Sequence, residues 1–117
     1  MEGIAMVLRK PPYGDINAAE AVRHALGAFN NEEKVSLIMV DGGVLLARKG
    51  QDNGDTGFTN LEGVLMAIID MGVEVFAENL SLIEHNVKQE DMVDGVTVVD
   101  IDDISVLLKK ADATMIF

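Results

Sequence analysis

The sequence contains no cysteine and no tryptophan, and it has only one tyrosine and four phenylalanines. The absence of cysteine excludes disulfides, thiolate metal sites, iron–sulfur clusters and cysteine nucleophiles. The scarcity of aromatic side chains argues against the stacking surfaces that bind single-stranded nucleic acid. No apolar run approaches the ~20 residues of a membrane helix, and no basic segment precedes an apolar core at the N-terminus. We therefore expect a cytoplasmic protein without a membrane segment.

Basic residues are also few, since nine Lys and Arg stand against twenty Asp and Glu. The net charge is −11 and the pI is near 4.3. A protein of this charge repels a phosphate backbone, so direct nucleic-acid binding is not expected. The two histidines, His24 and His85, lie far apart in the sequence and supply no metal-ligand set. We expect neither a metal nor a cofactor.

The 117 residues, 49% of them hydrophobic, suffice for one domain spanning residues 1–117. Short apolar runs that scarcely alternate with polar residues are typical of strands covered on both faces of a parallel sheet. Five such runs occur, at residues 4–8, 35–40, 73–77, 96–99 and 113–117. Segments with helical spacing separate them. This alternation predicts right-handed crossovers and a flavodoxin-like, doubly wound fold, with three α/β/α layers around a five-stranded, mainly parallel sheet.

Local signals mark the ends of the predicted helices. Capping residues open three of them, namely Asn17 with Glu20, Thr59 with Glu62, and Asp100. Gly72 is a candidate for the left-handed residue that ends the second helix. Asn86 is the candidate for the third, a shorter helical stretch at about residues 78–85. The apolar stripes of the first, second and fourth helices comprise Ala18, Ala21, Val22, Ala25, Leu26 and Phe29; Leu61, Val64, Leu65, Ile68 and Ile69; and Ile101, Ile104, Leu107 and Leu108.

One long segment breaks the alternation of strands and helices. Residues 42–60 are rich in Gly, Asp and Asn, which are turn and loop residues. A connection of this length is either functional or mobile. Residues 44–47 can form a helical turn within it. We predict a long polar loop at about residues 42–60 that acts as a lid with an apolar anchor.

Ligands of open α/β sheets bind beyond the carboxyl ends of the strands. The residues near those ends form the candidate pocket of this chain: Tyr13, Asp15, Asn17, Asp41, Phe76 and Glu78. Such a rim can bind a small polar ligand. The alternative interpretation is structural, with Asp15 and Asn17 as turn and cap residues. In that interpretation Asp41 opens a Gly turn and Glu78 adds charge to a helix start.

Motifs of known catalytic sites are missing from the sequence. The first strand-to-helix turn carries neither the G-x-G-x-x-G fingerprint nor the G-x-x-x-x-G-K-[ST] phosphate loop. The serines lie in no G-x-S-x-G context, which argues against a hydrolase triad. A phosphoacceptor receiver domain needs an acidic pair at the end of the first strand, where Arg9 and Lys10 stand instead. We expect no catalytic residue.

Some apolar residues lie outside the predicted core stripes. They are Met66 on the second helix, Met92 and Val93 before the fourth strand, and Ile116 and Phe117 at the end of the fifth. Apolar residues that the core does not account for indicate a surface that binds a partner. The alternative is that loops of the same chain cover them.

Three segments, in their order along the chain, carry a family resemblance. They are residues 4–8 followed by Pro12-Tyr13-Gly14, the stretch V-F-A-E-N-L at 75–80, and the ending A-D-A-T-M-I-F at 111–117. Together they resemble the DsrE/DsrF/TusC-like sulfur-relay proteins over essentially the whole chain. The resemblance implies a flavodoxin-like sheet, assembly into trimers or heterohexamers of the DsrEFH and TusBCD kind, and relay of persulfide sulfur between carrier proteins. In TusBCD the sulfur is destined for 2-thiouridine in tRNA.

The chain departs from this family pattern at one decisive position. Catalytic members carry the sulfur on a cysteine at the end of the third strand, in a segment like V-C-x-x-S-L. The matching residue here is Phe76, or Glu78 if the following helix is aligned without a gap from its far end. Neither side chain can hold a persulfide. The chain therefore resembles the DsrF/TusC branch, whose subunit is considered non-catalytic.

Two functions follow as hypotheses. In the first, the chain is a non-catalytic structural or docking subunit of a sulfur-relay complex, with identical subunits or cysteine-bearing DsrE- and DsrH-like subunits as partners. In the second, it is a homo-oligomeric small-molecule-binding protein or enzyme that uses the polar pocket under the 42–60 loop.

Overall fold

The computed structural model describes residues 3–13, 16–30, 34–51 and 60–117. Within these residues the strands are β1 (Ile4–Leu8), β2 (Val35–Met39), β3 (Glu74–Glu78), β4 (Val96–Val99) and β5 (Ala113–Ile116). The helices are α1 (Asn17–Asn30), α2 (Leu61–Met71), α3 (Asn79–Glu84) and α4 (Ile101–Lys110), with two short 3-10 helices, η1 (Asp41–Ala47) and η2 (Gln89–Asp91). The predicted alternation of strands and helices is confirmed.

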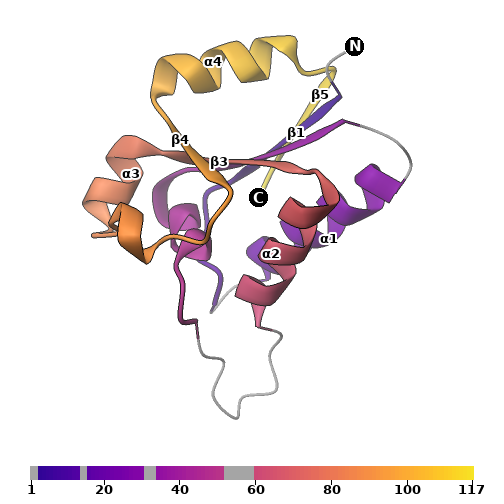
Figure 1. Cartoon of the computed structure of the whole chain (residues 1–117). Helices are drawn as coiled ribbons and strands as arrows, with labels where there is room; N and C mark the ends of the chain where they lie inside the picture. The colour runs from indigo at the N-terminus through magenta and orange to yellow at the C-terminus, as the bar shows by residue number, and fades with distance from the viewer. Residues whose placement is uncertain (1–2, 14–15, 31–33, 52–59) are drawn as a thin grey trace.

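The five strands form one sheet in the order β4-β3-β2-β1-β5, and all neighbouring strands are parallel. The chain advances in one direction from β1 to β4 and then returns to the far side of β1 as β5. Right-handed crossovers in opposite directions place their helices on opposite faces of a sheet. Accordingly α1 and α2 lie on one face and α4 on the other (Figure 1). This arrangement is the predicted doubly wound α/β fold.

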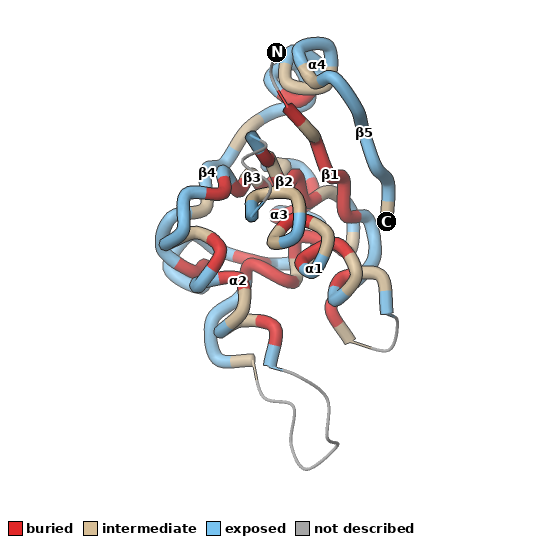
Figure 2. Tube along the Cα trace, turned by 90° about the vertical axis from the view of Figure 1, so that its right-hand side faces the viewer, coloured by how far each residue is buried: buried red, intermediate tan, exposed pale blue. Residues whose placement is uncertain are grey.

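The larger core lies between the sheet and the α1–α2 face. Every second residue of β1, β2 and β3 enters it, including Met6, Leu37 and Val75, and packs against the predicted stripes of α1 and α2. A smaller core lies under α4, where Ile104 contacts Ala5 and Ile38. Figure 2 shows buried residues in β1, β2 and β3, whereas β5 is exposed along its length. The centre of the sheet therefore carries most of the apolar burial.

The prediction that every strand is covered on both faces is wrong for the two edges of the sheet. All four residues of β5 are exposed, and β4 has two exposed and two half-buried residues. The reason is that α4 alone covers one face of the five-stranded sheet, and the helices on the other face leave Met115 and Val98 exposed as well. The stripe of α4 is also narrower than predicted, because Ile101 is exposed whereas Leu107 and Leu108 are half-buried.

Most predicted helix ends are confirmed. Asp100 accepts a hydrogen bond at Oδ1 from Asp103 N (2.8 Å), and the Asp103 carboxylate accepts one from Asp100 N. Gly72 and Asn86 both have the left-handed conformation, with φ of 114° and 56°. The start of α2 differs from the prediction, since its cap is Asn60, whose Oδ1 accepts from Glu62 N at 3.0 Å.

Thr59, the predicted cap of α2, lies outside the described residues. Asn17, the predicted cap of α1, is instead the first residue of that helix, because the carbonyl of Ile16 accepts the first helical bond from Glu20 N. Strand ends also shift, so that residues 40, 73 and 117 lie outside the strands predicted to contain them. No helix among the described residues is long and apolar enough to span a membrane.

The predicted loop at 42–60 begins as a buried helix. Its first part belongs to η1, in which Val44, Leu46 and Ala47 are completely buried in the larger core. The predicted helical turn at 44–47 is therefore present, but this part of the segment is neither polar nor loop. Residues 48–51 continue it at the surface, and residues 52–59 lie outside the described part of the chain. Apolar residues in the segment determine this outcome, because they fill the space at the ends of β1 and β2.

The segment after η1 forms a short antiparallel contact with the chain before β4. Val93 N donates to Ala47 O at 2.8 Å, and Lys49 N donates to Asp91 O at 2.7 Å. This contact buries Met92 and Val93, so the prediction of a partner surface is wrong for these two residues. Met66 and Ile116 are 48% and 66% exposed, and Phe117 is half-buried against the larger core.

Candidate functional site

A hydrogen-bonded network joins the carboxyl ends of β2 and β3. Its centre is Ser81 in α3, whose side chain is 2% exposed. The Ser81 hydroxyl accepts a bond from Asp41 N at 2.8 Å and donates a short one to the Glu78 carboxylate. Asp41, the donor of this bond, has a left-handed backbone conformation with φ of 49°. The network thus includes two residues of the predicted pocket and one residue that the prediction omitted.

The role of this network is structural. The Ser81 hydroxyl already donates a hydrogen bond to Glu78, and its oxygen already accepts one from the Asp41 amide. Such a fully engaged, buried hydroxyl fixes the position of its neighbours. It therefore holds the start of η1, the end of β3 and the first turn of α3 in one arrangement.

We expect Ser81→Ala to lower the free energy of unfolding by about 1–3 kcal/mol, because it leaves the Asp41 amide and the Glu78 carboxylate without their shared partner. Chemical denaturation followed by circular dichroism measures this loss. The matched control is Ser105→Ala, at an exposed position of α4, for which we expect a change within about 0.5 kcal/mol. Equal changes in the two variants would contradict the structural role of Ser81.

The two candidate sulfur positions on β3 have different surroundings. Phe76 is half-buried and packs in the smaller core beneath α4. Glu78 is the last residue of the strand, half-buried, and bonded to Ser81. The side chain at position 78 therefore lies at the carboxyl end of the sheet, where parallel sheets bind ligands.

Of the other predicted pocket residues, Tyr13 forms its hydrogen bond elsewhere. The Tyr13 hydroxyl accepts a bond from Leu61 N at 3.3 Å, which ties the loop after β1 to the start of α2. Asn17 is half-buried in the first turn of α1. Asp15 lies outside the described residues. The predicted rim is thus divided, with Asp41 and Glu78 around Ser81 and with Tyr13 elsewhere.

Tyr13 lines a hollow of about 390 Å³ that the sequence did not reveal. Three stretches of chain form its walls: the loop after β1, the helix η1, and residues 48–51. The wall residues include Pro12, Tyr13, Leu45, Arg48, Lys49 and Gln51. Because these residues come from three separate segments, only the folded chain brings them together.

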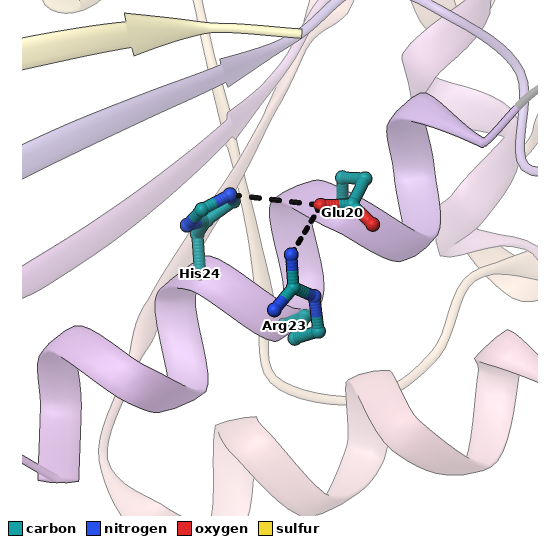
Figure 3. Close-up of polar contacts among 3 residues, drawn as sticks. All are labelled: Glu20, Arg23 and His24. Atoms are coloured by element: carbon teal, nitrogen blue, oxygen red, sulfur yellow. Dashed lines mark hydrogen bonds and ion pairs between the residues drawn. The ribbon is translucent and has the colours of Figure 1, made fainter.

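The charged cluster on α1 is a surface feature. Arg23 pairs with the Glu20 carboxylate at 2.6 Å, and His24 Nε2 lies 3.6 Å from the same carboxylate (Figure 3). The hydrogen bond from Arg23 holds the pKa of Glu20 below its usual 4.5 and raises the pKa of Arg23. The His24 ring packs against Phe117 with ring centroids 5.5 Å apart. Arg23 and His24 therefore both have interaction partners at the surface of α1.

No group of three or more His, Asp or Glu side chains in the described part of the chain can hold a metal ion. A groove of about 460 Å³ lies at the other edge of the sheet, between α3 and β4. Its lining mixes polar residues such as Asn79 and Asp94 with apolar ones such as Leu82, Ile83, Val96 and Val98.

Comparisons with known proteins extend over the whole chain. The model of the DsrE/DsrF-like family matches residues 2–117. An uncharacterized protein of Methanopyrus kandleri is 30% identical over 114 residues, which cover 97% of this chain and 93% of that protein. The intracellular sulfur oxidation protein DsrF of Allochromatium vinosum is 27% identical over 124 residues, with coverage of 93% and 91%.

Two solved structures share the fold. The ychN protein from E. coli superimposes with a TM-score of 0.91 at 20% identity, and both chains are covered completely. The protein MTH1491 of Methanobacterium thermoautotrophicum superimposes with a TM-score of 0.74 at 14% identity, with 94% of this chain and 96% of that chain covered. These likenesses agree with the layered, parallel sheet predicted from the sequence.

Proposed function

The chain belongs to the DsrE/DsrF-like family, and from this premise we propose that it is a subunit of a cytoplasmic sulfur-relay complex that provides docking surface instead of the reactive thiol. The printed name of the Allochromatium relative, an intracellular sulfur oxidation protein, supports a role of this class. The partners are cysteine-bearing DsrE- and DsrH-like subunits, as the family resemblance implies.

The observation that carries the proposal is the absence of any cysteine from the 117 residues. Persulfide transfer proceeds by attack of a thiolate on a sulfur atom, so each carrier in a relay needs a thiol. At the end of β3 this chain has Glu78, and the spacing Glu78-x-x-Ser81-Leu82 corresponds to the C-x-x-S-L of catalytic members. In this alignment, which takes Glu78 and not Phe76 as the matching residue, the position of the thiol is held by a carboxylate that is bonded to Ser81.

The structure offers an apolar surface for docking, which we call the α3–β4 surface and define by Leu80, Ile83 and Val98. Leu80 and Ile83 are each 62% exposed on α3, and Val98 is 43% exposed on β4. Ile83 and Val98 border the groove between these two elements. Exposed apolar side chains gathered around a groove mark protein interaction sites. This surface begins directly after Glu78, so a partner bound there would approach the end of β3.

Reconstitution of the relay tests the proposal. The chain is combined with the cysteine-bearing DsrE- and DsrH-like subunits of its own genome, and transfer of persulfide sulfur to an acceptor thiol is measured with and without the chain. We expect the chain to co-purify with those subunits, to carry no sulfur itself, and to raise the transfer rate when present. Unchanged transfer in its absence, or sulfur transfer by the chain alone, would contradict the proposed role.

A further inference from the structure

We propose that the hollow beside Tyr13 binds a small organic anion that also carries a hydroxyl or amino group. The proposal is independent of the sulfur-relay role, since the hollow lies apart from Glu78, Ser81 and the α3–β4 surface. Its volume of about 390 Å³ is within the range of small-molecule sites.

Two cationic side chains line this hollow. Arg48 and Lys49 are exposed at its wall, and neither forms an ion pair with a carboxylate of the described residues. They are adjacent in a chain with only nine basic residues against twenty acidic ones. A guanidinium offers paired N–H donors that match a carboxylate or phosphate group. The anionic group of the ligand is therefore expected to bind between Arg48 and Lys49.

The backbone that carries these cations is held in place before any ligand binds. Arg48 forms an antiparallel bridge with Met92, and Lys49 N donates to Asp91 O at 2.7 Å. From the other side, Gln51 Nε2 donates to Leu46 O at 2.8 Å and to Arg48 O at 2.9 Å. Binding to a chain segment that is already ordered costs little conformational entropy.

The hollow also has apolar lining residues. Pro12 is buried and Leu45 is half-buried, and both face the hollow together with the Tyr13 ring. The bond that Tyr13 accepts from Leu61 N holds the ring against the start of α2. A ligand that enters between the cations can therefore pack its carbon skeleton against proline and tyrosine rings.

Gln51 indicates that the ligand carries a hydrogen-bond donor. Its Nε2 faces two carbonyl oxygens, Leu46 O and Arg48 O, so the orientation of the amide is unambiguous. The other end of the amide, Oε1, is buried and has no hydrogen-bond partner among the described residues. A buried acceptor without a partner is costly and calls for a donor. A ligand hydroxyl or amino group provides that donor once the Gln51 amide shifts to bring Oε1 to the wall of the hollow.

Fluorescence of Tyr13 tests the proposal, because this residue is the only tyrosine and the chain has no tryptophan. The probe is glycerol 3-phosphate, compared at constant ionic strength with propyl phosphate, which lacks the hydroxyls, and with glycerol, which lacks the charge. We expect saturable changes in Tyr13 emission and a rise in Tm with glycerol 3-phosphate, weaker binding of propyl phosphate, and no response to glycerol.

The double variant Arg48→Gln/Lys49→Gln is expected to weaken binding of glycerol 3-phosphate by about tenfold or more. The matched control, Lys109→Gln/Lys110→Gln, removes the same charge from the end of α4 on the other face of the sheet and is expected to bind as the wild type does. Equal losses in the two variants, or no saturable response to glycerol 3-phosphate, would overturn the proposal. Equal binding of propyl phosphate and glycerol 3-phosphate would overturn the assignment of a donor to Gln51.

Discussion

Replacement of Gly43 by alanine is expected to lower the free energy of unfolding by about 3 kcal/mol. Gly43 lies in η1, directly against the end of β1, and a Cβ at this position would be 2.1 Å from the carbonyl oxygen of Leu8. That oxygen is not free to move, because it accepts a hydrogen bond from Val40 N at 2.9 Å. The added methyl group must therefore displace η1 from the larger core, in which Val44 and Leu46 are completely buried.

The matched control for this prediction is Gly63→Ala. Gly63 lies within α2 at an exposed position, and a Cβ there meets no atom within 4 Å. We expect this variant to raise the free energy of unfolding by about 0.5–1 kcal/mol, because alanine favours the helical conformation. Chemical denaturation followed by far-UV circular dichroism measures both changes. A Gly43→Ala protein as stable as the wild type would mean that η1 is not packed against β1 as described.

Substitution of the α3–β4 surface is expected to weaken assembly strongly without affecting the fold. The variant Leu80→Asp/Ile83→Asp places two carboxylates on a surface whose apolar side chains are otherwise 62% exposed. Burial of unpaired charge at an interface is strongly unfavourable. We expect binding to the cysteine-bearing subunits to weaken by about thirtyfold or more, which corresponds to roughly 2 kcal/mol.

Val106→Asp is the control for this surface. Val106 is 50% exposed on α4, which covers the opposite face of the sheet from α1 and α2. We expect this variant to bind the cysteine-bearing subunits as the wild type does, and all variants to have wild-type circular dichroism. Pull-down followed by titration calorimetry measures the affinities. If the Leu80→Asp/Ile83→Asp protein binds the cysteine-bearing subunits as tightly as the wild type does, α3 is not part of the interface.

The features of the fold that the sequence predicted correctly are those that depend on neighbouring residues. The cap Asp100 requires only free amides of the first helical turn, and the left-handed residues Gly72 and Asn86 require only local backbone freedom. The sequence predicted a helical turn with an apolar anchor at residues 44–47 but not its complete burial, since that burial depends on how η1 meets the ends of β1 and β2. Exposure of β4 and β5 likewise follows from strand order, and periodicity carries no information about strand order.

The candidate site was predictable only in part for the same reason. Asp41 and Glu78 were identified because they follow predicted strands, and the chain order alone places strand ends at one edge of a parallel sheet. Ser81 was missed, although its spacing of three from Glu78 on a predicted helix start was the available signal. The hollow beside Tyr13 had no signal, because its walls come from three separate segments and Gln51 has a partner in Leu46 only after η1 forms.

The position of β5 bears on the order in which the protein folds. Strands β1 to β4 pair with neighbours in sequence, whereas β5 returns to β1 from the end of the chain, and Gly3 N bonds to Asp112 Oδ2 across a separation of 109 residues. Closing so long a loop costs conformational entropy. Contacts of this kind are therefore expected to form late in folding. With all four residues exposed, β5 also contributes little to the larger core. Its amides are therefore expected to exchange with solvent through local opening, at a lower free energy than those of β2.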